Sequence, residues 1–152
     1  MISEGDKAPA ISATASDGST VNLAALGQPL VLYFYPKDDT SGCTLEAQDF
    51  TRLAPEFKKA GVKVVGLSRD PMKKHEKFIS KYDLAVPLAS DEDGKISEAF
   101  GTWVEKSMYG RKYVGMERAT YLIGSDGKVI RAWRKVKVPG HAQEVLKTAA
   151  QV

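Results

Sequence analysis

The sequence contains one cysteine and two histidines among its 152 residues, and these low counts exclude several kinds of site. One cysteine can form neither an internal disulfide nor a C-x-x-C dithiol centre. Together with two isolated histidines it does not supply the ligands of a zinc site, so no metal is predicted. A chain without a disulfide framework is typical of a reducing compartment, which predicts a cytoplasmic protein.

The sequence also lacks segments that would direct it to a membrane or to nucleic acid. It has no run of about 18 apolar residues, and its start, MISEGDKAPA, lacks the basic and apolar regions of a secretory signal. It has no glycine-rich phosphate loop, and we predict no cofactor. The net charge is only +3, without the clustered basic face that nucleic-acid binding needs. The stretch RAWRKVKV at 131–138 alternates apolar and basic residues, as a half-buried strand does.

What is present is an alternation of strand and helix patterns over a length that suits one domain, residues 1–152. The patterns predict a hairpin at 10–15 and 20–23, strands at 29–35, 62–68, 86–89, 119–123 and 129–134, and helices at 43–60, 71–82, 95–100 and 140–150. Pro55 should kink or restart the first helix. This order predicts a thioredoxin-like α/β fold, a central mixed sheet flanked by helices, with an N-terminal β-hairpin and an insertion near 84–117.

The single thiol lies in YFYPKDDTSGCTLEAQDF, where an apolar run gives way to a turn and then to a helix. A lone cysteine is often a small buried hydrophobic residue, and this is the alternative to any function. Cys43, however, follows Thr40-Ser41-Gly42, a composition typical of a helix start. Unpaired amides and the positive end of the helix dipole favour a thiolate there.

A helix terminus alone does not stabilise a thiolate enough for catalysis. Moving a thiol from a pKa of about 8.5 to about 6 takes roughly 3.4 kcal/mol. A helix terminus contributes about 0.3–1 kcal/mol, or about 2 kcal/mol when partly buried. A fixed cation is therefore expected nearby. Because full ionisation increases the reactive fraction only modestly, the same cation should also stabilise the transition state.

Three residues of this stretch, Pro36, Thr40 and Cys43, form the pattern P-x-x-x-T-x-x-C, which resembles the active-site signature of peroxiredoxins. The whole stretch is similar to the peroxiredoxin Q group, also called bacterioferritin comigratory proteins. The segment GMERATYLI resembles the arginine-bearing strand of that group, and VKVVGLSRD, SMYG and WRKVKVPGH are similar to its other segments. The resemblance covers nearly the whole chain and implies a thioredoxin-like fold.

The resemblance implies a role for each matching residue. Cys43 is the nucleophile, whose thiolate attacks the peroxide O–O bond and becomes a sulfenic acid. Thr40 offers its hydroxyl to the thiolate and the peroxide, and Pro36 shapes the loop and shields the pocket. Arg118 is the expected cation, because a guanidinium stays charged and presents several donors in a fixed geometry. The backbone amides of Gly42 and Cys43 are expected to donate to the leaving oxygen.

Two assignments have alternatives at this point. Glu46, one helical turn after Cys43, matches an acidic position of the family, where it is expected to help bind the substrate. It is equally compatible with a first-turn acid that interacts with the helix dipole. Arg118 is also compatible with a surface ion pair to Glu117 or Glu46.

The sequence departs from the family pattern at three places. Ser41 replaces the usual proline of a T-P-G-C-T motif, with little expected loss because serine can cap a helix. Many members carry a resolving cysteine at the position of Gln48, and others carry it near Ile79 or Ser80. Without it, the resemblance implies a one-cysteine cycle in which an external thiol (thioredoxin, glutaredoxin or glutathione) reduces the sulfenic acid. Ser80 is nearly isosteric with cysteine and is compatible with a replaced native resolving cysteine, whereas Gln48 is more typical of a native residue.

The remaining residues with possible chemistry are expected to be structural. His75 has four charged neighbours and is predicted on a solvated edge of its helix, while His141 is predicted to open the last helix. Other large side chains are expected to form the core or the pocket wall: Trp103, Met108, Tyr109 and Trp133.

The leading interpretation is a monomeric cysteine peroxidase that reduces hydrogen peroxide and small organic hydroperoxides. A redox-sensing or chaperone-like binding protein on the same fold is the alternative, because the resolving cysteine is missing. A third interpretation is a thiol–disulfide reductase that does not react with peroxide. Peroxide consumption with dithiothreitol, thioredoxin or glutathione as reductant distinguishes them.

Overall fold

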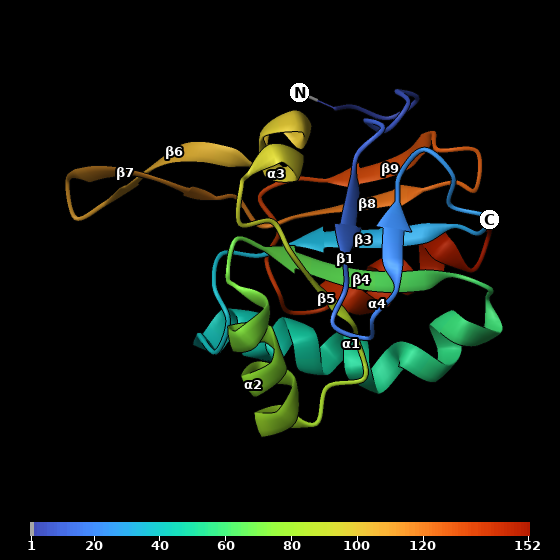
Figure 1. Cartoon of the computed structure of the whole chain (residues 1–152), viewed down its shortest axis with the longest axis horizontal. Helices are drawn as coiled ribbons and strands as arrows, with labels where there is room; N and C mark the ends of the chain where they lie inside the picture. The colour runs from blue at the N-terminus through green and yellow to red at the C-terminus, as the bar shows by residue number, and fades with distance from the viewer. Residues whose placement is uncertain (1) are drawn as a thin grey trace.

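A five-stranded mixed sheet forms the centre of the computed structural model, which describes residues 2–152. The strand order is β5-β4-β3-β8-β9 (Figure 1). β3, β4 and β5 run parallel, whereas β8 is antiparallel to both β3 and β9. The strands are β3 (Leu30–Phe34), β4 (Lys63–Ser68), β5 (Leu88–Ser90), β8 (Ala119–Ile123) and β9 (Val129–Trp133).

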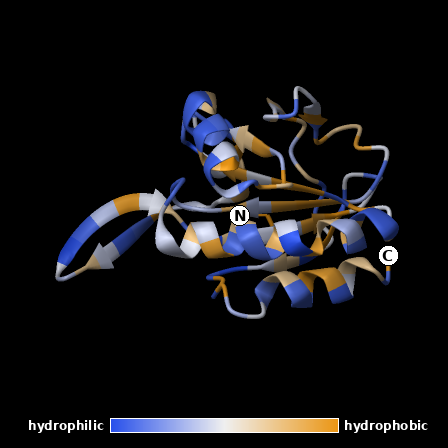
Figure 2. Cartoon of the chain, turned by 90° about the horizontal axis from the view of Figure 1, so that it is seen from below, coloured by the Kyte–Doolittle hydropathy of each residue, from blue (hydrophilic) through white to orange (hydrophobic). Residues whose placement is uncertain are grey.

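Helices cover one face of this sheet. Every residue of β3 is buried, as expected of a central strand whose apolar run contacts layers on both sides. Val31 and Tyr33 point to the face packed by α1, α2 and α4, and the hydrophobic residues of these helices lie in the same core cluster. The helices are α1 (Ser41–Lys59), α2 (Met72–Tyr82) and α4 (His141–Ala149). Figure 2 shows hydrophobic and hydrophilic residues alternating along the helices, as the burial of one face requires.

The other face carries the N-terminal hairpin and a short helix. β1 (Ser12–Thr14) pairs antiparallel with β2 (Thr20–Asn22), and α3 (Lys95–Phe100) follows β5. Leu32 and Phe34 of β3 pack in this second cluster together with Val21 and Phe100. The thioredoxin-like arrangement and the N-terminal hairpin predicted from the sequence are therefore confirmed.

A hairpin of β6 (Trp103–Met108) and β7 (Arg111–Met116) projects from the body of the molecule, at the left of Figure 1. Its turn residues Tyr109 and Gly110 have φ of 52° and 76°, the left-handed pair of a tight hairpin turn. The sequence patterns did not predict these two strands. Met108 and Tyr109 are 55% and 98% exposed, so their expected place in the core or pocket wall is wrong.

Several local expectations can be compared with the structure. The first helix begins at Ser41, two residues before the predicted start, and continues through Pro55 without a break. Trp133 is buried, as predicted. Trp103 is partly buried, and the guanidinium of Arg69 lies 3.5 Å from its ring centroid.

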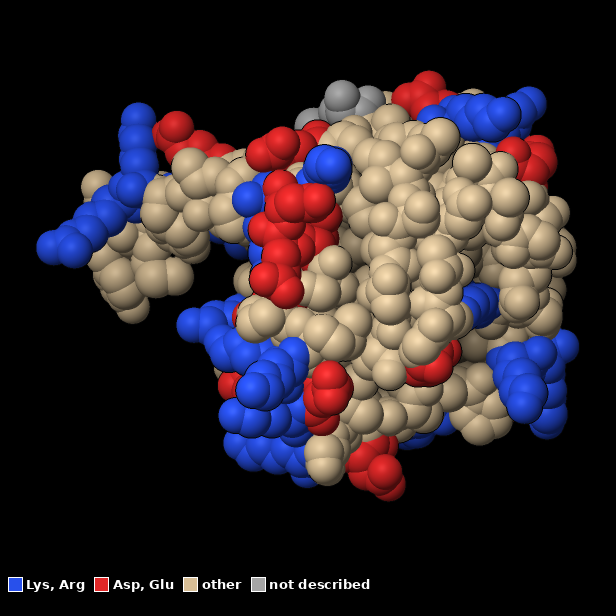
Figure 3. All heavy atoms as spheres, viewed as in Figure 1, with Lys and Arg blue, Asp and Glu red and all other residues tan. Residues whose placement is uncertain are grey.

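Charged side chains are unevenly distributed over the face drawn in Figure 3. Lysine and arginine side chains gather over α2 and along the β6–β7 hairpin, with an acidic group between them. The lysines of α2 include Lys73, Lys74 and Lys77, all exposed. None of the helices in residues 2–152 combines the length and hydrophobicity needed to span a bilayer.

Candidate active site

Cys43 lies in the first turn of α1, immediately beyond the carboxyl end of β3. Thr40 is the N-cap residue, and its carbonyl accepts the first helical hydrogen bond from the N–H of Thr44 at 2.9 Å. The N–H groups of Gly42 and Cys43 therefore precede the first intrahelical donor and are available to a ligand. Cys43 is only 2% exposed, so the sulfur lies beneath the surface at the positive end of the helix.

The sheet register brings Arg118 to this helix start from 75 positions further along the chain. Phe34, the last residue of β3, pairs with Ala119, the first residue of β8. Arg118 directly precedes Ala119, so it lies at the same sheet edge from which α1 departs. Its Nη2 donates to Sγ of Cys43 at 3.4 Å, and its Nη1 donates to Oε1 of Glu46 at 2.7 Å. The expected cation is thus in contact with the thiol.

Gly42 provides the space for this approach. A Cβ atom at this position would lie 3.1 Å from Nη2 of Arg118, closer than most Cβ contacts in proteins, so the guanidinium would have to shift slightly. The absence of a side chain at Gly42 therefore lets the guanidinium lie against the first turn of α1.

Glu46 is buried, with only 1% of its surface exposed, and lies beyond the first turn of the helix. It is therefore not a first-turn acid on the dipole, and its ion pair with Arg118 is not a surface pair. Burial raises the pKa of Glu46 to about 7, against the lowering effect of Arg118. Burial lowers the pKa of Arg118, but Glu46 and Cys43 outweigh that effect and raise it. The guanidinium stays charged and its carboxylate partner titrates near neutrality.

Thr40 and Pro36 lie at the rim of the site. The Thr40 hydroxyl donates to the carbonyl of Lys37 at 2.9 Å, so in this structure it bonds within its own turn and not to the sulfur. Both Thr40 and Pro36 are exposed. Ser41 is the first helical residue and not the cap, so the expectation that serine caps this helix is wrong.

Aromatic side chains form the inner wall. The ring of Tyr33 stacks on Phe50 with centroids 4.6 Å apart. Burial, with a further contribution from Glu46, raises the pKa of Tyr33 well above its usual value. Burial and, after it, the positive charge of Arg118 lower the pKa of Lys106 on β6.

Both histidines are buried, which sequence reasoning missed for His75. His75 is 0% exposed and contacts Asp38, so the predicted solvated edge is wrong. Its position three residues before Phe78 on the apolar stripe of the helix was the available signal. His141 opens α4, as predicted, and its Nε2 lies 2.8 Å from the Thr120 hydroxyl. Burial lowers the pKa of His141 to about 4, so it is neutral at pH 7.

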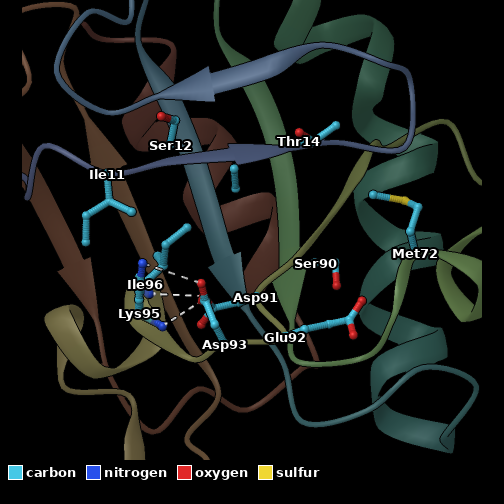
Figure 4. A pocket seen from close by; sticks show the side chains of 11 residues that line it. Ile11, Ser12, Thr14, Met72, Ser90, Asp91, Glu92, Asp93, Lys95 and Ile96 are labelled. Carbon is cyan, nitrogen blue, oxygen red and sulfur yellow. Dashed lines mark hydrogen bonds and ion pairs between the residues drawn. The ribbon is translucent and has the colours of Figure 1, made fainter.

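A cavity of about 580 Å³ lies elsewhere, between β1 and the start of α3 (Figure 4). It is lined by acidic side chains that include Asp91, Glu92 and Asp93. The Asp91 carboxylate accepts from the amides of Ile96 and Ser97 and so caps α3. None of the predicted site residues lines this cavity.

The resemblance places a resolving cysteine at Gln48 or near Ile79 and Ser80. Gln48 is exposed on α1, and on α2 Ser80 is exposed whereas Ile79 is partly buried. None of them is cysteine, and Cys43 is the only thiol of the sequence. An intramolecular disulfide is therefore impossible.

Comparison with known proteins gives a consistent result. A family model described as the AhpC/TSA family matches residues 4–132. Peroxiredoxin Bcp of Xanthomonas campestris is 52% identical over 132 residues, covering 86% of this chain and 82% of that protein. Peroxiredoxin Bcp of Bacillus subtilis is 43% identical over 148 residues, covering 97% and 94%. A solved structure of the Xanthomonas campestris bacterioferritin comigratory protein, described for its alkyl peroxide reduction activity, aligns with a TM-score of 0.85 at 47% identity over 93% of this chain and 90% of that one.

Proposed function

The chain belongs to the AhpC/TSA family, and we propose that it is a thiol-dependent peroxidase of the peroxiredoxin Q group in which Cys43 is the nucleophile. The observation that carries this proposal is the contact of Arg118 with the Cys43 sulfur at a helix N-terminus. A fixed cation and free amides there favour both a thiolate and the negative charge that develops on a departing oxygen.

In the first half-reaction the Cys43 thiolate attacks one oxygen of a hydroperoxide. An S–O bond forms and the O–O bond breaks, so the cysteine becomes a sulfenic acid and the peroxide is reduced to an alcohol or water. The leaving oxygen takes up one proton. Arg118 donates to the reacting oxygens, and the amides of Gly42 and Cys43 assist at the leaving oxygen. Glu46 holds Arg118 in place through their ion pair.

Thr40 and Pro36 complete the proposed site from its rim. Rotation of the Thr40 side chain away from the Lys37 carbonyl directs its hydroxyl toward the sulfur and the bound peroxide. Pro36 begins the loop that leads to the helix and limits the access of water. These two roles rest on the resemblance and on position, since neither side chain contacts Sγ in a hydrogen bond here.

In the second half-reaction an external thiol attacks the sulfenic sulfur. Water leaves and a mixed disulfide forms; a second thiol then releases reduced Cys43 and carries away the disulfide. Thioredoxin, glutaredoxin or glutathione in the cytoplasm would supply these thiols. Because Sγ is buried, the first turn of α1 must unwind to admit them. The proposal takes residues 1–152 as one domain that acts as a monomer.

The test is peroxide consumption by the purified protein with dithiothreitol, thioredoxin or glutathione as reductant. We expect turnover with at least one of them, and none in Cys43→Ser, because no other thiol is present. Unchanged circular dichroism of Cys43→Ser excludes loss of fold. Peroxide turnover that survives this substitution would contradict the proposal. A protein that reduces a model disulfide but ignores peroxide would instead be a thiol–disulfide reductase.

A further inference from the structure

His75 forms a buried polar contact that the peroxide chemistry above does not use. It lies on α2 and is 0% exposed. Its Nδ1 is 2.6 Å from Oδ2 of Asp38, and its Nε2 is 2.9 Å from the carbonyl oxygen of Ala89. The Tyr35 hydroxyl donates to the other carboxylate oxygen of Asp38 at 2.5 Å.

The acceptors around the ring determine where its hydrogens lie. A carbonyl oxygen only accepts, so Nε2 of His75 carries a hydrogen and donates it to Ala89. The 2.6 Å distance between Nδ1 and Asp38 requires a second hydrogen between nitrogen and oxygen. The contact is thus a buried hydrogen bond in which one hydrogen lies between Nδ1 of His75 and Oδ2 of Asp38. Each partner depends on the other, because an unpaired polar group at this depth is costly.

Asp38 connects this pair to the loop that precedes the nucleophile. It lies two residues after Pro36 and two residues before the N-cap Thr40. Its backbone N–H donates to Oδ2 of Asp70 at 2.8 Å, and the Ser68 hydroxyl donates to the same oxygen at 2.7 Å. The loop is therefore held at Asp38 through both side chain and backbone, from α2 and from the end of β4.

We propose that His75 is a positioning residue for the thiol: through Asp38 it anchors the loop before α1 and keeps the first helical turn folded, with Cys43 facing Arg118. This rests on the proposed function, because it concerns the same thiol. Peroxide reacts in the folded arrangement, whereas an external thiol reaches the sulfenic sulfur only after the turn unwinds. His75 therefore sets the balance between the two half-reactions, and its loss changes their rates in opposite directions.

Two neutral substitutions separate the Asp38 contact from the rest of the imidazole. In His75→Asn the amide nitrogen is bonded to Cγ, as Nδ1 is, and can still donate to Asp38. In His75→Gln the amide nitrogen takes the place of Nε2 and can donate only toward Ala89. Both substitutions replace the imidazole with a neutral amide of similar size, so they form a matched pair.

Two rates are measured on the full chain: reaction of the reduced protein with hydrogen peroxide by stopped flow, and capture of the sulfenic acid by glutathione, followed by mass spectrometry. We expect His75→Gln to slow the peroxide step roughly tenfold to a hundredfold and to accelerate glutathione capture. His75→Asn should restore most of both rates. Equal behaviour of the two variants, or a change of both rates in the same direction, overturns the proposal.

A general loss of stability is excluded with a control in the other core cluster. Val129→Ala removes buried side-chain volume in β9, and urea unfolding establishes how its stability compares with that of His75→Gln. The control should leave the ratio of the two rates unchanged. If Val129→Ala shifts this ratio as His75→Gln does, the effect of His75→Gln comes from a general loss of stability and not from the position of the loop, and the proposal fails.

The proposal stays testable if His75→Gln does not fold or if the enzyme has no peroxidase activity. In the wild-type protein, NMR should detect a slowly exchanging hydrogen between Nδ1 of His75 and Oδ2 of Asp38, and the absence of this hydrogen bond overturns the proposal. Absence of peroxide turnover in the wild type contradicts the proposed function alone. Amide hydrogen exchange at residues 41–46 then tests whether His75 keeps the first turn of α1 folded. The proposal requires this exchange to be faster in His75→Gln than in Val129→Ala, and equal exchange in the two variants overturns it.

Discussion

Arg118 and Glu46 form a 2.7 Å ion pair directly beside the thiol, and the second Nη of the arginine contacts the Cys43 sulfur. The guanidinium is therefore fixed at two points. It cannot turn away from the sulfur without leaving a buried carboxylate unpaired. Glu46 orients the guanidinium of Arg118, and the guanidinium in turn contacts the sulfur at which peroxide is proposed to react.

The first prediction concerns the pH dependence of this pair. Burial raises the pKa of Glu46 from 4.5 to about 7, against the lowering effect of Arg118. The folded protein thus holds a proton that the unfolded chain releases, so this stabilising contribution is present below about pH 4.5 and is lost as the pH rises to about 7. As the pH rises between these values, the free energy of unfolding of the wild type should fall by up to about 3 kcal/mol relative to that of Glu46→Gln.

Urea unfolding of both proteins at a series of pH values measures this difference. Above the pKa the two curves of unfolding free energy against pH should run parallel. Curves that are parallel over the whole range would show that Arg118 keeps Glu46 ionised in spite of its burial.

The second prediction concerns Arg118. Arg118→Ala removes the donor to the developing oxyanion as well as the charge beside the sulfur, so the peroxide rate constant should fall by about 10²–10³. The pH profile of Cys43 alkylation should change by less, because a thiolate needs less stabilisation than the transition state. Arg118→Lys keeps the charge without the two-point geometry and should recover alkylation better than peroxide reduction. Equal losses in both assays would limit Arg118 to stabilising the thiolate.

The third prediction uses the contact between Gly42 and Arg118. Gly42→Ala places a methyl group about 3.1 Å from Nη2, so the guanidinium must shift by a few tenths of an ångström away from the first turn. The same change favours the helix by up to about 1 kcal/mol. We therefore expect a slower peroxide reaction in a protein that is no less stable, with Ser41→Ala, one position earlier and exposed, as the control. Unchanged peroxide kinetics in Gly42→Ala would mean that the position of Arg118 at the first turn is not critical.

The fourth prediction concerns the oxidised products. Because Cys43 is the only thiol, oxidation without reductant should give monomer at the mass of the sulfenic or sulfinic acid. With glutathione present, the mass of a mixed disulfide should replace it. Non-reducing gels and intact-mass measurement distinguish these species. A Cys43–Cys43 disulfide between two chains as the main product would make a second copy the resolving partner.

The features set by local pattern were predictable from the sequence. The apolar run of β3, the turn before Cys43 and the strand patterns of β8 and β9 each identify their element without knowledge of the rest of the chain. The pairing of Cys43 with Arg118 followed from an energetic requirement for a cation together with the family resemblance. The structure places the two residues in contact.

The features that the sequence did not predict correctly depend on residues that are distant along the chain. His75 lies among charged neighbours in the sequence, and its burial follows from Asp38, which lies 37 positions away. Met108 and Tyr109 are hydrophobic or aromatic, but the hairpin that carries them leaves the body, and no local pattern indicates that direction. The depth of Glu46 likewise depends on Arg118 and the sheet edge, 72 positions further along.

The projecting hairpin has a practical consequence for protein engineering. Its turn at Tyr109 is almost fully exposed, a position of the kind that tolerates an inserted domain. β7 ends two residues before Arg118, whose guanidinium contacts Sγ of Cys43, so an insert at the turn would be connected through β7 to a residue that touches the reacting thiol. A circularly permuted fluorescent protein inserted between Tyr109 and Gly110 would test whether oxidation of the cysteine reaches the hairpin as an optical signal. The fold thereby offers an attachment point for a genetically encoded peroxide biosensor.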